Sequence, residues 1–253
     1  MKAVLLVGGL GTRLRSVVPS LPKALASVGD RPFLELLVRQ LSQQGIRRLV
    51  MCTGHLAEQI QDTFRDGRDF GVEIAYSMET VQMGTAGALK LARHYVRDEP
   101  EFLVLNGDSF VDVDFGELID FHRKHDGVAT MAVVPVENAS RYGTVRMGAG
   151  ARVLKFVEKT GENEPGIINA GVYVFSSAVF ELIAEGPASL ERDIFPQLVE
   201  RGVYAAEQQG MFIDIGTPDD YARAKGMSDR LADAIVAKRG SIPLVSVVDV
   251  SRV

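Results

Sequence analysis

The chain contains few cysteines and no strongly basic segment. Among its 253 residues, Cys52 is the single cysteine, so an internal disulfide framework is excluded and a reducing compartment is favoured. Cys52 lies in the apolar run 49–52, which predicts packing in the core. The 28 lysine and arginine residues stand against 33 acidic residues, which gives a net charge of −5. Since no basic run is present, we expect no nucleic-acid partner.

Long apolar runs are also absent. No stretch approaches the roughly 18 continuous apolar residues that a membrane-spanning helix needs, so we expect no membrane partner. The first residues lack the pattern of a signal peptide, and Gly8 and Gly9 interrupt the first apolar run. These observations predict a cytoplasmic protein.

The histidines show no metal-ligand spacing. His122 and His125 lie three residues apart on a polar helix face, which favours solvent-exposed side chains. The sequence also shows no serine–histidine–aspartate or cysteine–histidine arrangement and no internal repeat. Catalysis by a histidine-activated nucleophile is therefore not indicated.

Strand and helix patterns alternate through the first half of the chain. Apolar strand-like runs cover 2–7, 48–53, 72–76 and 101–105, and helical spacing covers 33–44, 56–64 and 85–96. This alternation predicts an α/β fold with a Rossmann-like, doubly wound sheet and helices on both faces. Ligands of such sheets bind at the carboxyl ends of the strands.

The second half contains shorter strands, which predict a mixed, partly antiparallel addition to the sheet. They cover 128–136, 143–147, 153–157 and 168–175, followed by helical stretches at 177–183 and 194–200 and a short strand pair within 204–214. Thr217 and Pro218 open a further helix as N-cap and first-turn residue. We expect one domain over 1–227, with halves of about 1–127 and 128–227. An extension at 228–253 follows, whose last residues, 241–253, fit either a terminal strand or a tail.

A glycine-rich loop follows the first strand. It reads Gly8-Gly9-Leu10-Gly11-Thr12-Arg13-Leu14 and leads to Pro22-Lys23. Glycines let backbone N–H groups approach a ligand, and the two cations suit a polyphosphate. A Walker A loop would need Gly-Lys-Ser/Thr, and a dinucleotide fingerprint would need a third glycine where Leu14 stands. The remaining class is a nucleotidyltransferase loop, in which Arg13 contacts the leaving pyrophosphate.

This loop resembles the signature of the sugar-1-phosphate nucleotidyltransferases, or nucleotide-sugar pyrophosphorylases. The resemblance covers residues 1 to about 225 in the family's order and includes Gly84-Thr85-Ala86-Gly87, Asn106-Gly107-Asp108, Phe156-Val157-Glu158-Lys159, Asn169-Ala170-Gly171 and Asp214-Ile215-Gly216-Thr217-Pro218. Within the family, the short chain and the segments 141–145 and 212–216 are most similar to the D-glycero-D-manno-heptose 1-phosphate guanylyltransferases. The implied fold is GT-A-like, with a nucleotide half and a small antiparallel sugar-binding half. Enzymes of this family often form homodimers, which the resemblance leaves open here.

The resemblance also implies roles for individual residues. Arg13 and Lys23 would be catalytic, and Asp108 and Asp214 would hold Mg²⁺. Nucleotide-binding residues would be Leu6, Gly8, Gly9, Gly11, Thr12, Glu79, Gln82, Gly84 and Thr85. Sugar-phosphate-binding residues would be Gly143, Glu158, Lys159 and Asn169.

The implied reaction converts an NTP and a sugar 1-phosphate into an NDP-sugar and pyrophosphate. The attacking phosphate has a second pKa of about 6, so it is already anionic near neutral pH and needs no general base. The obstacle is repulsion between two polyanions, which the cations must offset while they align the reactants. Arg13 would act at the β- and γ-phosphates, Lys23 at the α-phosphate and Lys159 at the acceptor phosphate.

The base and the sugar stay open at this point. Guanylyltransferases of the family commonly carry Glu-Pro-Leu before Gly84-Thr85, but Val81 and Gln82 stand in the first two places here. Glu79 could replace the missing carboxylate for GTP, or Gln82 could bind a pyrimidine. Alternatives are a mannose, glucose or N-acetylmuramic 1-phosphate enzyme with another NTP, an inactive regulatory paralogue, and, more distantly, an NAD-binding oxidoreductase. Capsule, lipopolysaccharide, S-layer glycan and antibiotic-sugar pathways all remain open.

Overall fold

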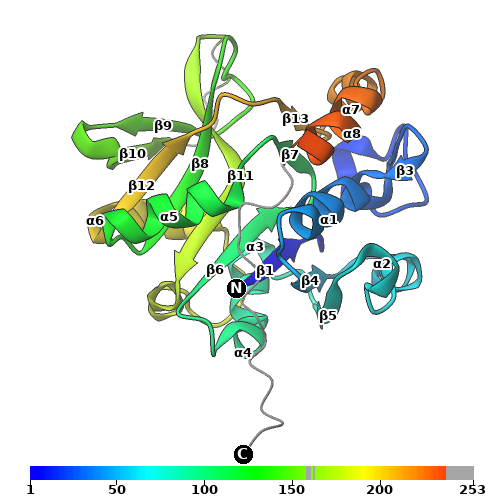
Figure 1. The fold of residues 1–253 in the computed structure, drawn as a ribbon, viewed down its shortest axis with the longest axis horizontal. Helices are drawn as coiled ribbons and strands as arrows, with labels where there is room; N and C mark the ends of the chain where they lie inside the picture. Colours follow the sequence, from blue (N-terminus) through cyan, green and yellow to red (C-terminus); the bar gives the residue numbers. More distant parts are fainter. Residues whose placement is uncertain (158–160, 162, 238–253) are drawn as a thin grey trace, which may run out of the picture.

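A mixed β-sheet runs through the molecule (Figure 1). The structure is a computed structural model that describes residues 1–157, 161 and 163–237, so Glu158, Lys159 and the segment 241–253 lie outside the described residues. The strand order is β10-β9-β11-β6-β1-β4-β5, with β8 paired to β11 and β12 paired to β8. The strands are β1 (Lys2–Leu6), β4 (Arg48–Thr53), β5 (Glu73–Met78), β6 (Glu101–Asn106), β8 (Ala129–Val136), β9 (Thr144–Met147), β10 (Val153–Val157), β11 (Gly166–Ser176) and β12 (Val203–Glu207).

The two halves of the sheet differ in strand direction. Strands β6, β1, β4 and β5 are parallel, with Val4 in register with both Val50 and Val104. Strand β11 then runs antiparallel to β6, β8 and β9. The prediction of an α/β fold with a parallel first half and a mixed second half is therefore confirmed.

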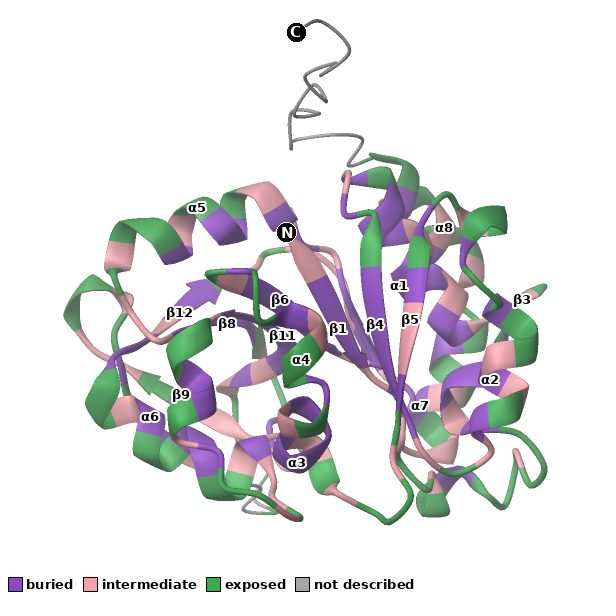
Figure 2. Cartoon of the chain, turned by 90° about the horizontal axis from the view of Figure 1, so that it is seen from below, coloured by how far each residue is buried: buried purple, intermediate pink, exposed green. Residues whose placement is uncertain are grey.

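Side-chain alternation along the strands produces two cores. In β1, Ala3 and Leu5 join one buried cluster, whereas Val4 joins the other. The first core packs under α1 (Phe33–Gln43), α2 (Ala57–Phe64), α5 (Phe115–His125) and α8 (Ser228–Ala237). The second packs under α3 (Gly84–Leu91), α4 (Arg93–Val96) and α6 (Phe195–Arg201). Figure 2 shows α1, α5 and α8 on one side of the sheet and α3, α4 and α6 on the other.

Small paired segments complete the fold. Strands β2 (Ser27–Val28) and β3 (Arg31–Pro32) pair with each other, and β7 (Ser109–Val111) pairs with β13 (Phe212–Asp214). Helix α7 (Pro218–Lys225) begins as predicted, with the Thr217 side chain accepting a hydrogen bond from Asp220 N. Helix α8 packs against α1, so residues 228–237 belong to the folded body.

Three local predictions differ from the structure. The helix expected over 85–96 is interrupted at Ala92 and forms α3 and α4. The strands within 204–214 do not pair with each other, because β12 joins β8 and β13 joins β7. His122 is buried rather than solvent-exposed, since β8 passes beneath α5 and places Thr130 Oγ1 3.0 Å from His122 Nδ1.

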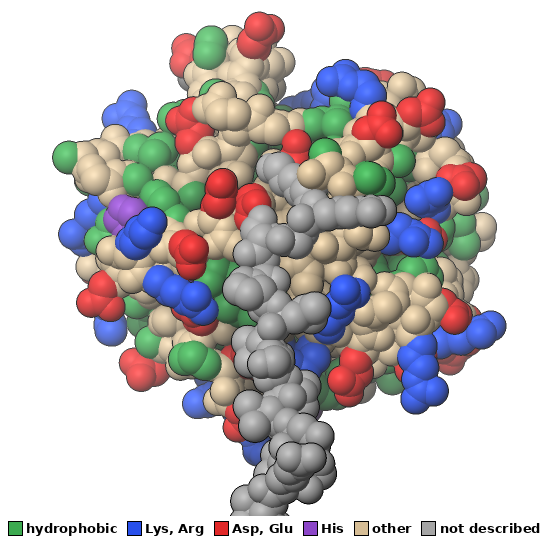
Figure 3. Space-filling view, viewed as in Figure 1, with side chains coloured by type: hydrophobic (Ala, Val, Ile, Leu, Met, Phe, Trp, Pro, Cys, Tyr) green, Lys and Arg blue, Asp and Glu red, His purple; other side chains and the backbone are tan. Residues whose placement is uncertain are grey.

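The prediction for Cys52 is confirmed. Cys52 is fully buried in the second core, as expected for a packing residue. In the ranges that the structure describes, no helix has both the length and the apolar character to cross a membrane. Figure 3 shows cationic and anionic side chains interspersed over one face of the molecule, with no large patch of one sign in the visible part.

Candidate functional site

A cleft of about 540 Å³ lies at the carboxyl ends of the central strands. Because Leu6 of β1 is in register with Asn106 of β6, Gly8 and Asp108 both follow two residues later at the same edge of the sheet. The second half of the chain supplies the opposite wall. The predicted site residues that line the cleft are Leu6, Gly8, Gly9, Arg13, Glu79, Gln82, Gly84, Thr85, Asp108, Gly143, Asn169 and Asp214.

The glycine-rich loop presents Arg13 to this cleft. Gly11 adopts a left-handed conformation with φ +58°, and a short 3₁₀ turn follows over Thr12–Leu14. Leu14 is buried in the first core, which anchors the turn and leaves the Arg13 side chain at the cleft. Gly11 and Thr12 themselves are not among the lining residues of the described cleft.

The two predicted metal ligands lie side by side. Strand β13 pairs with β7 so that Asp214 is in register with Ser109, the residue after Asp108. Ser109 Oγ lies 3.3 Å from both Asp108 Oδ1 and Asp214 Oδ2. Lys23 Nζ donates to Asp108 Oδ2 at 2.5 Å, so Lys23 reaches the site through this carboxylate although it does not line the cleft.

Charged neighbours shift the pKa values of both Asp108 and Asp214. Burial raises the pKa of Asp108, but Lys23, Ser109 and Arg13 together more than offset this, and the pKa lies below its usual value. Burial and the neighbouring Asp108 carboxylate raise the pKa of Asp214 to about 6. When both carboxylates are ionised, the ammonium group of Lys23 therefore compensates only part of their negative charge.

The carboxylate pair fits a cation that arrives with phosphates. Among the described residues, no group of three or more histidine, cysteine or acidic side chains could hold a metal ion alone. Mg²⁺ commonly uses one or two carboxylates and completes its shell with water and substrate phosphates. Asp108 and Asp214 therefore suit a nucleotide-bound Mg²⁺ better than a resident structural ion.

Glu79 lies where the loop 79–83 meets the glycine-rich loop. Its Oε2 accepts a hydrogen bond from Met83 N at 2.8 Å, which closes the loop 79–83. A Cβ atom at Gly8 would lie 2.3 Å from Glu79 Oε1, so glycine at this position makes room for the carboxylate. Burial raises the pKa of Glu79. Val81 is 65% exposed and does not line the cleft.

The opposite wall is built on β9 and β11. Asn169 Nδ2 donates to Tyr173 Oη at 2.7 Å, and Asn169 Oδ1 accepts from Gly171 N at 3.0 Å. The backbone of Gly143 is held by Asn169, whose N donates to Gly143 O at 3.0 Å. These bonds bring two of the four predicted sugar-phosphate residues together.

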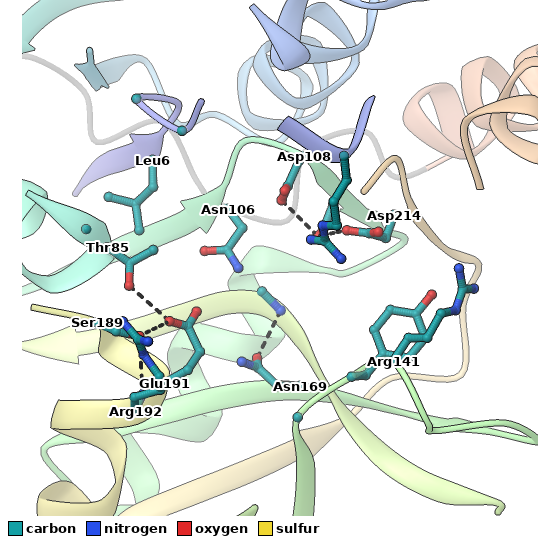
Figure 4. A pocket seen from close by; sticks show the side chains of 18 of the residues that line it. Leu6, Thr85, Asn106, Asp108, Arg141, Asn169, Ser189, Glu191, Arg192 and Asp214 are labelled. Carbon is teal, nitrogen blue, oxygen red and sulfur yellow. Dashed lines mark hydrogen bonds between the residues drawn. The ribbon is translucent and has the colours of Figure 1, made fainter. Parts of the chain in front are cut away.

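Several lining residues were not predicted from the sequence. Arg141 makes a bidentate ion pair with the buried Asp220, at 2.5 and 2.9 Å. On the wall near Thr85, Glu191 accepts hydrogen bonds from two hydroxyl groups (Figure 4). The remaining unpredicted lining residues are Ala88, Asn106, Ser109, Tyr142, Phe156, Gly171, Ser189, Arg192, Phe212 and Thr217. Several lie within the motifs noted above, but nothing in 189–192 resembles a phosphate or sugar signature.

Comparisons with known proteins place the chain among relatives of known family. The model of the nucleotidyl transferase family matches residues 2–229. The chain is 38% identical over 225 residues to a mannose-1-phosphate guanyltransferase of Yarrowia lipolytica and 39% identical over 225 residues to the mannose-1-phosphate guanylyltransferase catalytic subunit beta of Danio rerio. Each match covers 87% of this chain and 62% of the relative, so the chain spans less than two thirds of their length.

A solved structure is similar over almost its whole length. The crystal structure of HddC from Yersinia pseudotuberculosis, complexed with GMP-PN, is 32% identical in sequence and has a TM-score of 0.80. The match covers 89% of this chain and 98% of that chain.

Proposed function

The chain belongs to the nucleotidyl transferase family, and on that premise we propose that it transfers the nucleotidyl group of an NTP to a sugar 1-phosphate and releases pyrophosphate. The observation that carries the proposal is the close approach of Asp108 and Asp214 in a cleft that Arg13 also lines, with Lys23 donating to Asp108. A dinucleotide oxidoreductase has no need of paired carboxylates and two cations at this edge.

The residues of the cleft suit a direct displacement between phosphates. Arg13, which lines the cleft, would offset charge on the leaving pyrophosphate, and Lys23, which donates to Asp108, would act at the α-phosphate. Asp108 and Asp214 would hold a Mg²⁺ ion, which would supply neutralisation of phosphate charge when bound. Lys159 would serve the acceptor phosphate, as the family resemblance implies.

For the nucleotide, we propose GTP. Guanine offers N–H donors at N1 and N2, and a carboxylate is an acceptor for both. Glu79 supplies such a carboxylate at the cleft, two residues before the position that the family's motif would give it. Burial raises the pKa of Glu79, and the N–H donors of a bound guanine would stabilise its ionised form.

For the sugar, we propose D-glycero-D-manno-heptose 1-phosphate, on the similarity of the segments 141–145 and 212–216 to that subfamily. The second candidate is mannose 1-phosphate, because the two curated relatives described above carry mannose 1-phosphate in their names. The two sugars share their ring configuration and differ at the exocyclic end, so one cleft could accept both to different extents.

A panel of NTPs and sugar 1-phosphates, with pyrophosphate release as the readout, tests the proposal. We expect the highest kcat/KM with GTP and heptose 1-phosphate, and loss of about 10²-fold in kcat for Lys23→Ala, by analogy with removal of one preorganised donor. Release of no pyrophosphate with any pair would overturn the proposed function. A preference for another NTP would overturn only the assignment of Glu79 to guanine.

A further inference from the structure

Glu191 occupies a fixed position on the wall of the cleft. It lies in a short π-helical turn, Leu190–Ile194, between β11 and α6. Its Oε2 accepts hydrogen bonds from Thr85 Oγ1 and Ser189 Oγ, both at 3.0 Å. Two donors on one oxygen hold the carboxylate in a single orientation.

The backbone around Glu191 is fastened to the nucleotide half. Ala188 O accepts from Ala86 N at 2.9 Å, and Ala188 N donates to Met83 O at 2.9 Å. Leu190 N donates to Thr85 Oγ1 at 2.7 Å. These contacts are made by the start of α3, which directly follows the loop 79–83. The nucleotide half therefore sets the position of the Glu191 carboxylate, although Glu191 belongs to the second half of the chain.

The second carboxylate oxygen is available to a ligand. No hydrogen-bond partner of Glu191 Oε1 occurs within 1–157, 161 and 163–237, and Glu191 projects into the cleft between Thr85 and Asn169 (Figure 4). Burial is the largest cause that raises the pKa of Tyr173, and the negative charge of Glu191 is the second. Glu191 therefore lies near the Asn169–Tyr173 pair.

The chemistry of this oxygen restricts what it can bind. An ionised carboxylate only accepts hydrogen bonds and repels phosphate, so its partner must be an uncharged or cationic donor. Asn169 already uses its Oδ1 and Nδ2 atoms for Gly171 N and Tyr173 Oη. Glu191 is thus the stronger acceptor on this wall for the hydroxyl groups of a sugar.

We propose that Glu191 is a specificity-determining residue that accepts a hydrogen bond from a ring hydroxyl of the sugar 1-phosphate. The inference rests on the proposed function. Thr85 and Ser189 act as positioning residues, and through Thr85 the nucleotide half sets the place of a sugar contact.

Steady-state kinetics of Glu191→Gln provide the first test. The amide oxygen still accepts from Thr85 and Ser189, while an NH₂ group replaces the free oxygen, so the fold is preserved and the acceptor is lost. We expect the KM for the sugar 1-phosphate to rise about tenfold or more, as for loss of a hydrogen bond to a charged group, with the KM for GTP changed much less. The matched control is Glu185→Gln, whose side chain is 88% exposed outside the cleft.

Deoxy analogues of the sugar 1-phosphate separate a substrate contact from a merely structural role. In the wild type, one analogue should lose about tenfold in kcat/KM relative to the parent sugar, and in Glu191→Gln that penalty should vanish. A purely structural role would lower the thermal midpoint and affect every analogue equally, which would overturn the inference. If the wild type turns over no sugar 1-phosphate, the proposed function fails instead.

Discussion

Ser109 is the residue that brings the two predicted metal ligands together. It follows Asp108 directly and pairs with Asp214 across β7 and β13, and its hydroxyl lies 3.3 Å from both carboxylates. Lys23 neutralises one carboxylate, and burial leaves the other with a raised pKa. An additional cation would therefore stabilise the ionised form of Asp214.

Replacing Asp108 by Asn should weaken the use of Mg²⁺. The amide keeps the size of the side chain but removes one of the two charges, and even loss of an outer-sphere partner costs about tenfold in metal affinity. We expect the Mg²⁺ concentration for half-maximal pyrophosphate release to rise about tenfold or more. Asp98→Asn, with a side chain 79% exposed at the surface, is the control. A Mg²⁺ titration that matches the wild type would contradict the metal assignment.

The sequence predicted Asp108, Asp214 and Lys23 but not Ser109, whose hydroxyl lies between the two carboxylates. Asp108 was found because it follows a buried strand and a glycine, a local pattern. Ser109 and Asp214 are 105 residues apart, and Thr85 and Glu191 are 106 apart, so no local spacing encodes either contact. The family motifs supplied Asp214, and no motif covers Glu191.

At the scale of elements, strands were predicted well and their partners less well. The continuous apolar runs of β1, β4 and β6 are visible in the sequence because each strand contributes to both cores. The partners of β12 and β13 depend instead on β8 and β7, which lie far away in the sequence. His122 has a different explanation: Thr130 is only eight residues away, but the polar face of the helix gives no sign that α5 packs on β8 at this point.

The start of α3 depends on glycine at position 84. Gly84 has φ +68°, and a Cβ atom there would lie 2.5 Å from Ala188 O, which is backbone and cannot move aside cheaply. Gly84→Ala should therefore lower the free energy of unfolding by more than about 1 kcal/mol in urea titrations. It should also raise the KM for both substrates, because Ala188 joins the two walls.

Gly9→Ala is the matched control for this prediction. A Cβ atom at Gly9 would meet no atom within 4 Å. Its free energy of unfolding should stay within about 0.5 kcal/mol of the wild type. Equal losses in the two variants would show that the contact with Ala188 is not the cause.

At the scale of the whole molecule, two polar bridges join segments that are far apart in the sequence. Thr85 and Glu191 connect α3 to the segment after β11. Arg141, in the loop before β9, connects that loop to α7 through Asp220 and Thr217. Each bridge borders the cleft, so the relative placement of its walls depends on hydrogen bonds as well as on the shared sheet.

The Arg141–Asp220 bridge should make a measurable, pH-dependent contribution to stability. Asp220 is 3% exposed, whereas Arg141 is 44% exposed, so solvent screens part of the interaction. We expect Asp220→Asn to lower the free energy of unfolding by roughly 1–3 kcal/mol at pH 7, with Asp219→Asn, its exposed neighbour, as the control.

The pH dependence of this loss follows from the pKa of Asp220. Burial raises that pKa, but hydrogen bonds from Arg141 and Thr217 more than offset this, so the folded-state pKa lies below its usual value. The stabilisation is therefore complete above the unfolded-state pKa of about 3.9 and is lost as the pH falls through the lowered folded-state value. In urea titrations from pH 7 to pH 3, the difference between wild type and Asp220→Asn should stay constant to about pH 4.5 and then shrink. A difference that grows on acidification would mean that the ionised carboxylate destabilises the fold.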